Sequence, residues 1–171
     1  MKLPFLRTPQ HEDEPTVVAM TGVRRGDKVH FWGALPALLL PLAARSGLSG
    51  QVTVISPDAA ALVSAAERDG LLVDSAGAPL PDAGYDLAVV HTDGAWTSTL
   101  GPLLDATRIA GRLTVIAGDP PAGLLGRLRG VAAATSPTDA EVIAAMTGAG
   151  WKRVRMIGER DGVRFIEGVR V

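Results

Sequence analysis

The chain has 171 residues, of which 47% are hydrophobic and 20% are charged, so it fits one folded domain better than a disordered chain. Its 17 basic and 18 acidic residues leave a net charge of −1, which gives no support to nucleic-acid or anionic-membrane binding. The absence of cysteine excludes disulfides, thiolate metal ligands and a cysteine nucleophile.

Residues 1–15 are predicted to be a flexible tail, because they are polar and interrupted by prolines. An alternative is a short docking segment for a partner, built on Leu3, Phe5 and Leu6. The tail turns acidic and does not resemble a secretory signal, so we expect a cytoplasmic protein. The longest apolar run, over 31–44, is too short to span a bilayer and contains two prolines.

Residues 16–171 are predicted to form a single domain in which helices and strands alternate. In chain order, the first half contains a helix over 16–23, a strand over 28–32, a helix over 34–47, a strand over 51–56, a helix over 57–70 and a strand over 71–75. "SPD" predicts how the third of these helices begins: Ser56 is the N-cap, Pro57 is the first helical residue and Asp58 favours the helix dipole.

The second half continues the alternation and ends differently. It contains a strand over 85–92, a helix over 97–110, a strand over 111–118, a connection over 119–137, a helix over 138–150 and a closing β-hairpin over 151–171. Thr138 and Glu141 predict a capping box at the start of the last helix. The predicted fold class is therefore α/β, a doubly wound, mostly parallel Rossmann-like sheet with a C-terminal antiparallel hairpin.

Several segments share a likeness to one family, in the right order and at the right spacing. They are "TGVRRGDKV" at the start of the first strand, "APLPDAGYDLAVVH" at the fourth strand, "LLDATRIAGRLTVIAG" at the fifth and "MTGAGWKRVRMIGERDGVRFIEGVR" at the last helix and hairpin. Together they resemble the class I S-adenosylmethionine-dependent methyltransferases over nearly the whole chain from Thr21 to Val171. The resemblance implies the doubly wound sheet of that family.

The family's cofactor loop is altered in this sequence. In the family, the first strand ends in an acidic residue followed by a glycine-rich turn that lets the backbone approach the cofactor. The acidic position is Phe31 here, and the three glycine positions are Gly33, Leu35 and Ala37. Leu35 is expected to place a branched side chain where the methionine part of the cofactor would lie. Gly33 is needed for the turn whether or not a cofactor binds.

Two further cofactor positions follow from the resemblance. The acidic residue that would hold the ribose hydroxyls falls on Ser56, whose single oxygen cannot hold two neighbouring hydroxyls in the bidentate way that the two oxygens of a carboxylate do. Asp74 aligns with an acidic residue that contacts the adenine amino group, although a turn residue is an equally good interpretation. The candidate cofactor-binding residues are therefore Gly33, Ser56 and Asp74.

Candidate catalytic residues follow the fourth strand, because the carboxyl ends of parallel strands face the ligand crevice. His91 and Asp93 are the candidates, with Trp96 beside them, and His91 has the chemistry of a general base. The competing interpretation is a turn with a packing tryptophan, which we prefer. No spacing indicates a metal site.

The altered loop favours a methyltransferase-fold protein with a degraded S-adenosylmethionine site. Such a protein would take no cofactor and would act as a non-catalytic interaction or scaffold subunit, with a protein partner or a second copy of itself. Its crevice would be filled from within by Phe31, Trp32, Leu35 and Leu38. The alternative is an atypical but active S-adenosylmethionine-dependent methyltransferase acting on a small molecule. In that case the lost ribose carboxylate would cost about 1.5–3 kcal/mol of binding. A binder of another small molecule in the same crevice is a third possibility.

Overall fold

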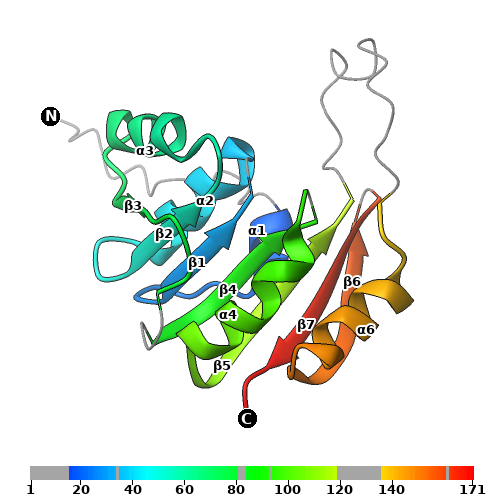
Figure 1. Cartoon of the computed structure of the whole chain (residues 1–171). Coiled ribbons are helices and arrows are strands. Elements are labelled where there is room, and N and C mark those ends of the chain that lie inside the picture. Colours follow the sequence, from blue (N-terminus) through cyan, green and yellow to red (C-terminus); the bar gives the residue numbers. More distant parts are fainter. Residues whose placement is uncertain (1–15, 34, 81–83, 93, 119–135, 161) are drawn as a thin grey trace, which may run out of the picture.

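The computed structural model describes residues 16–33, 35–80, 84–92, 94–118, 136–160 and 162–171. The predicted tail over 1–15, Asp93 and most of the predicted connection over 119–137 lie outside the described residues. The described chain forms one sheet with helices on both faces (Figure 1).

The strands and helices follow the predicted alternation. The strands are β1 (Lys28–Trp32), β2 (Gln51–Ile55), β3 (Val73–Ser75), β4 (Tyr85–His91), β5 (Thr107–Ala117), β6 (Lys152–Arg160) and β7 (Val163–Val169). The helices are α1 (Thr16–Thr21), α2 (Pro36–Ser46), α3 (Ala59–Arg68), the 3-10 helix η1 (Trp96–Thr99), α4 (Leu100–Ala106) and α6 (Asp139–Gly148).

The sheet is mostly parallel with an antiparallel end. Its strand order is β3-β2-β1-β4-β5-β7-β6. Strands β1 to β5 pair in parallel, and β7 pairs antiparallel with both β5 and β6. The predicted fold class, a doubly wound sheet that ends in an antiparallel hairpin, is therefore confirmed.

Each face of the sheet has its own hydrophobic core, because successive side chains of a strand point to opposite faces. In β1, Val29 and Phe31 are fully buried in the core beneath α1, α2 and α3. Trp32, the next residue, packs into the opposite core, beneath α4 and α6. Figure 1 shows these two layers of helices on either side of the strands.

Long-range polar contacts hold the helices on the second face. Trp151 is fully buried, and its indole Nε1 donates a hydrogen bond to the carbonyl oxygen of Leu100 at 3.0 Å, which joins α4 to the start of β6. Arg164 on β7 donates to the carboxylate of Asp139 at 2.9 Å, at the first residue of α6. These contacts tie helices to strands that are distant in sequence.

The predicted helix over 97–110 ends earlier than expected. α4 stops at Ala106, and residues 107–110 belong to β5 instead. Ala110 has a φ of 62°, which an α-helix does not accommodate, and its backbone N–H donates to the carbonyl oxygen of Arg170. Arg108 is held by the carboxylate of Asp86 on β4. The backbone and this ion pair therefore draw the segment into the sheet.

The start of α3 also differs from the prediction. The helix begins at Ala59, and the residue before it, Asp58, is the N-cap in place of Ser56. The Ser56 hydroxyl accepts a hydrogen bond from the backbone N–H of Asp58 at 3.2 Å, while its carbonyl accepts one from Ala59. These bonds close a separate turn between β2 and α3, which delays the helix.

The predicted capping box at the start of α6 is confirmed. The Glu141 backbone N–H donates to the Thr138 hydroxyl, and the Glu141 carboxylate accepts from the Thr138 backbone N–H. The hydrogen bonds from the backbone and side chain of Thr138 hold the pKa of Glu141 below its usual range.

His30 is a buried polar residue in the middle of the sheet. It is fully buried on β1, and its ring meets that of Tyr85 edge to face, with the centroids 5.2 Å apart. Neither ring nitrogen has a hydrogen-bond partner among the residues that the structure describes. Burial disfavours the charged form and lowers the pKa of His30 to about 4.

Among the described residues, no helix is long and apolar enough to cross a membrane.

Acid should destabilise the fold through His30. The unfolded chain takes up a proton near the ordinary histidine pKa of 6.5, whereas the folded chain takes it up only near a pKa of about 4. Stability is therefore lost as the pH falls through this window, by about 3 kcal/mol. Replacing the imidazole by His30→Leu removes this loss, so the stability of the variant relative to wild type should rise by that amount between pH 7 and pH 4. Urea unfolding at both pH values measures the change, and a pH-independent difference would contradict it.

The capping box should contribute measurably to stability. Thr138→Ala removes the hydroxyl that caps α6 and is expected to lower the free energy of unfolding by about 1 kcal/mol. Thr147→Ala, at an exposed position within the same helix, is the matched control and should change stability much less. Equal effects of the two substitutions in urea unfolding would show that the cap has no special role.

Candidate functional site

A crevice lies where the strand order of the sheet reverses. The chain passes from β1 outward to β2 and β3, then returns to β4 on the other side of β1. The connections after β1 and β4 therefore lead to helices on opposite faces, and open α/β sheets bind ligands in the gap that this leaves. A cavity of about 290 Å³ lies there, lined by Trp32, Gly33, Ile55, Ser56, Pro57, Gly94 and Ala95.

Trp32 has the largest side chain among the described residues that line the crevice. It is the last residue of β1 and stands between Ile55 of β2 and Val90 of β4 in the register of the sheet. Its side chain is partly buried and packs against the second core, which includes Trp96. With Ile55 and Pro57, it makes the walls of the crevice largely apolar.

Gly33 makes the turn out of β1 possible. Its φ is 145°, and a Cβ at this position would lie 3.0 Å from the Cβ of His91 and 3.4 Å from the Cζ of Phe31. Its backbone N–H donates to the carbonyl oxygen of Ile55. The fold alone therefore requires a glycine, which leaves bare backbone on the crevice.

The altered residues of the loop serve the core. Phe31 is fully buried beneath the helices of the first face, and Leu38 lies in the same core. Leu35 is partly buried and packs against that core, and it is not among the residues that line the cavity. Ala37 is exposed in the first turn of α2. Of the four residues expected to fill the crevice, only Trp32 borders it, and the cavity stays open.

Ser56 lies at the crevice, as expected from the resemblance. It follows β2 directly and lines the cavity. Its hydroxyl already accepts the hydrogen bond from the Asp58 backbone N–H. It carries the only side-chain oxygen among the described residues that line this cavity.

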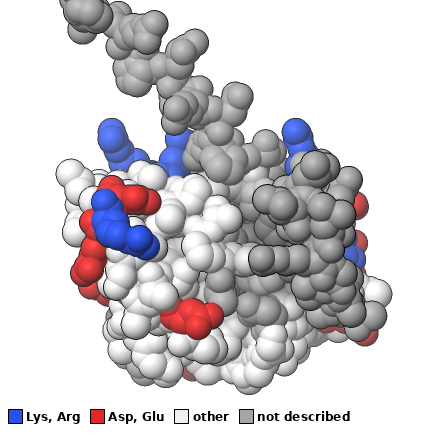
Figure 2. All heavy atoms as spheres, turned by 90° about the horizontal axis from the view of Figure 1, so that it is seen from above, with Lys and Arg blue, Asp and Glu red and all other residues white. Residues whose placement is uncertain are grey.

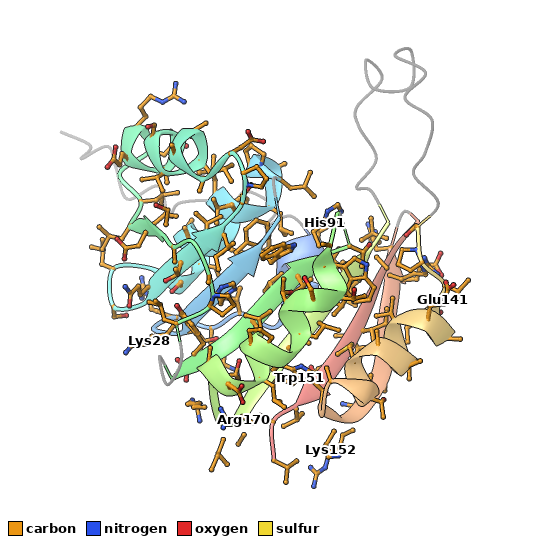
Figure 3. The ribbon with its side chains drawn as sticks, viewed as in Figure 1. Lys28, His91, Glu141, Trp151, Lys152 and Arg170 are labelled. Atoms are coloured by element: carbon orange, nitrogen blue, oxygen red, sulfur yellow. The ribbon has the colours of Figure 1, made fainter. Side chains whose placement is uncertain are left out.

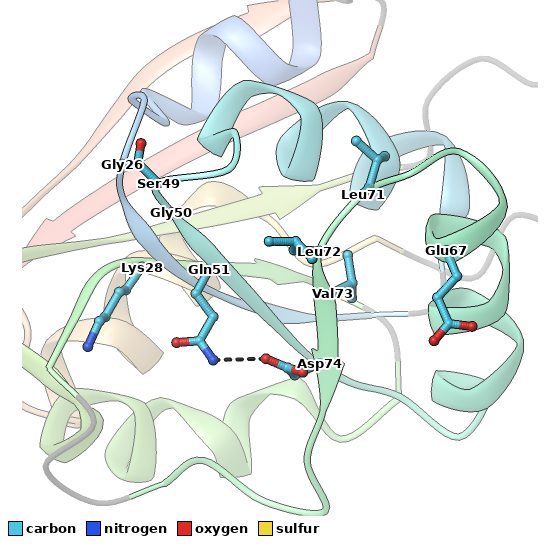
Figure 4. Close-up of a pocket in the computed structure, with 10 residues that line it drawn as sticks. All are labelled: Gly26, Lys28, Ser49, Gly50, Gln51, Glu67, Leu71, Leu72, Val73 and Asp74. Atoms are coloured by element: carbon cyan, nitrogen blue, oxygen red, sulfur yellow. Dashed lines mark hydrogen bonds between the residues drawn. The ribbon is translucent and has the colours of Figure 1, made fainter.

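Asp74 lies elsewhere in the structure. Its carboxylate accepts a hydrogen bond at 2.8 Å from Nε2 of Gln51, which is the first residue of β2. Both residues border a different hollow, of about 540 Å³, which also includes Lys28 at the first residue of β1 (Figure 4). The structure therefore brings Gly33 and Ser56 together at the crevice and does not bring Asp74 to them.

His91 ends β4 at the same edge of the sheet as the crevice, opposite the edge marked by Lys28 (Figure 3). It is 5% exposed, and its Nε2 lies 3.2 Å from the carbonyl oxygen of Gly118, so this nitrogen carries the proton and donates it. This bond joins the ends of β4 and β5. Trp96 is buried in the second core, which agrees with the packing interpretation, and Asp93 lies outside the described residues.

Figure 2 views the face on which the parallel strands end, and its described part shows few charged side chains, of both signs. Within the described part of the chain, no group of three or more histidine or acidic residues is placed to hold a metal ion.

Some residues of the crevice were not identified from the sequence. Gly94 and Ala95 follow β4 and close one side of the cavity, and Pro57 was interpreted only as the start of a helix. Only their position in the sequence could have identified them, because each lies within a few residues of the carboxyl end of a parallel strand. Trp32 was expected to fill the crevice, and it lines it instead.

Comparison with known proteins finds likeness in structure and not in sequence. No family model and no curated protein matches the sequence. A SAM-dependent methyltransferase from Aquifex aeolicus superposes with a TM-score of 0.71 at 19% identity, covering 93% of this chain and 90% of that one.

Two further solved structures cover most of this chain. The apo form of SibL, an S-adenosylmethionine-dependent methyltransferase, gives a TM-score of 0.66 at 22% identity, covering 92% of this chain and 54% of SibL. PigF with SAH gives a TM-score of 0.60 at 18% identity, covering 85% of this chain and 51% of PigF. The chain thus spans about half the length of these two proteins.

These neighbours correct one expectation. The prediction that the chain takes no cofactor is wrong, because the neighbours from A. aeolicus and SibL are dependent on S-adenosylmethionine and PigF was solved with SAH.

The order of the seven strands, the antiparallel hairpin and the solved structures lead to the same conclusion. The chain has the fold of the class I S-adenosylmethionine-dependent methyltransferases.

Proposed function

We propose that the protein is an atypical S-adenosylmethionine-dependent methyltransferase that binds its cofactor in the crevice and acts on a small molecule. The observation that carries this proposal is the open cavity at the carboxyl ends of β1, β2 and β4. It persists even though the loop that borders it has lost two of the three glycines of the family pattern. The exchanged side chains pack into the core or face solvent and leave the space free.

The residues present fit the nucleoside part of the cofactor. Trp32, Ile55 and Pro57 offer apolar surface for a planar base, and Ser56 offers one hydroxyl. The bare backbone at Gly33 allows a ligand to approach the end of β1 closely. When bound, the cofactor supplies a methyl group on a positively charged sulfur, which a nucleophile of the acceptor can attack.

The described side chains of the crevice contribute position and exclusion of water. None of the described residues that line the cavity carries a carboxylate, an imidazole or an amine. His91 uses Nε2 to bond Gly118. This supports an acceptor that is nucleophilic without help from a general base, such as a thiolate, an amine or an ionised phenol.

A second candidate function is a subunit that keeps the cofactor but does not transfer its methyl group, and that acts through a protein partner. The lack of a carboxylate, an imidazole or an amine among the described residues that line the cavity favours it, and the fold uses both positions of the family's acidic residues. Phe31 is buried in the core, and the Ser56 hydroxyl is engaged by the turn before α3. Both candidate functions require cofactor binding, so only a measurement of methyl transfer distinguishes them.

Cofactor binding should be weak but measurable. Without the ribose carboxylate, we expect a dissociation constant on the order of 0.1 mM for S-adenosylhomocysteine. Isothermal titration calorimetry measures it. Ala95→Trp places an indole at an exposed position that borders the cavity and should abolish binding without lowering the melting temperature.

The control for this substitution is Ala144→Trp, at an exposed position of α6 outside the crevice, which should bind as wild type does. No heat of binding at millimolar ligand would contradict the proposal. Formation of S-adenosylhomocysteine from S-adenosylmethionine with small thiols, amines or phenols would support the enzyme. Binding without turnover would favour the second candidate.

A further inference from the structure

The crevice offers different surfaces to the base and to the sugar of a nucleoside. Its walls are an indole, an isoleucine, a proline and an alanine, with bare backbone at two glycines. Ser56 supplies the single side-chain oxygen among its described residues. A planar base therefore finds mainly apolar surface, whereas a sugar finds few groups to which it can hydrogen-bond.

Ser56 is poorly suited to hold two neighbouring hydroxyls. A carboxylate accepts from both at once, but a serine hydroxyl has one donor and two acceptor sites. One acceptor site is already used by the backbone N–H of Asp58 at 3.2 Å. The turn that delays the start of α3 thus uses one acceptor site of the only side-chain oxygen among the described residues that line the cavity.

Trp32 is well suited to hold a base. Its backbone is fixed by strands on both sides, opposite Ile55 and Val90, and its side chain is supported by the second core. A ring held in this way loses little freedom when a ligand stacks on it. Stacking of a base on an aromatic side chain contributes about 1–3 kcal/mol.

We infer that the crevice recognises its ligand through the planar purine base against Trp32, and that the ribose hydroxyls contribute little. This inference rests on the proposed function and adds the chemical group on which affinity depends. The ligand class is accordingly adenine derivatives in general, with or without a complete ribose diol.

The test compares two ligands by calorimetry on the full chain. The probes are S-adenosylhomocysteine and its 2′-deoxy analogue, which lacks one hydroxyl of the diol. Wild type should bind both within about threefold, because Ser56 cannot grip the diol. A loss of about thirtyfold or more for the deoxy analogue would overturn the inference while the proposed function stands. Absence of binding by both ligands would overturn the proposed function and, with it, this inference.

Two substitutions make the comparison specific. Trp32→Leu keeps an apolar side chain but removes the ring, and it should lower the affinity for both ligands about tenfold, in line with the usual strength of stacking. Ser56→Asp supplies the missing carboxylate and should tighten S-adenosylhomocysteine about tenfold while leaving the deoxy analogue nearly unchanged. Unaltered affinity in Trp32→Leu would contradict the role of the ring.

Tryptophan fluorescence provides a second readout and guards against misfolding. Ligand stacking on Trp32 should change the emission of wild type, and the change should disappear in Trp32→Leu. Urea unfolding of the variant must remain cooperative for the comparison to hold. Ala144→Trp, outside the crevice, serves as the binding control because it adds an indole without altering the walls.

Discussion

The pairing of β1 with both β2 and β4 is the constraint on which the rest of the structure depends. With β1 between them, the chain must leave β1 and β4 toward opposite faces of the sheet. That divergence produces the crevice whatever residues line it. Parallel strands also require both faces to be covered, which explains why a separate core lies on each side.

The end of β1 shows how the core and the crevice depend on the same few residues. Alternation along the strand sends Phe31 into one core and leaves Trp32 at the border of the other. A buried charge at Phe31 would be costly without a partner, so an aromatic side chain suits this packing. Gly33 then turns the chain because no side chain fits against His91. The chemistry of the loop has changed while its path has been kept.

The sequence predicted the fold well because its strongest signals are local. The run of β-branched and apolar residues in β1 and β2, and the capping box at Thr138, have direct physical causes within a few residues. The predicted helix over 97–110 was too long because Arg108 binds Asp86, a contact between residues far apart in sequence. Ser56 was wrongly predicted to be the N-cap, because its hydroxyl can accept a backbone hydrogen bond either as a helix cap or in a separate turn before the helix.

The site was harder to predict than the fold, since it depends on where side chains point. Leu35 was expected to block the crevice, yet it packs against the core. Asp74 lies near the predicted strand end in sequence, but the register of β3 on β2 pairs it with Thr53 and leaves it hydrogen-bonded to Gln51. A single sequence carries no signal for either outcome, because both follow from the pairing of distant segments.

A crystal structure of the protein grown with S-adenosylhomocysteine tests the central claim most directly. The account predicts density for the nucleoside in the cavity between β1, β2 and β4, with the adenine ring against the indole of Trp32 and at most one hydrogen bond from Ser56 to the ribose. An empty crevice at saturating ligand, or a ribose held by two side-chain hydrogen bonds with the base away from Trp32, would contradict it.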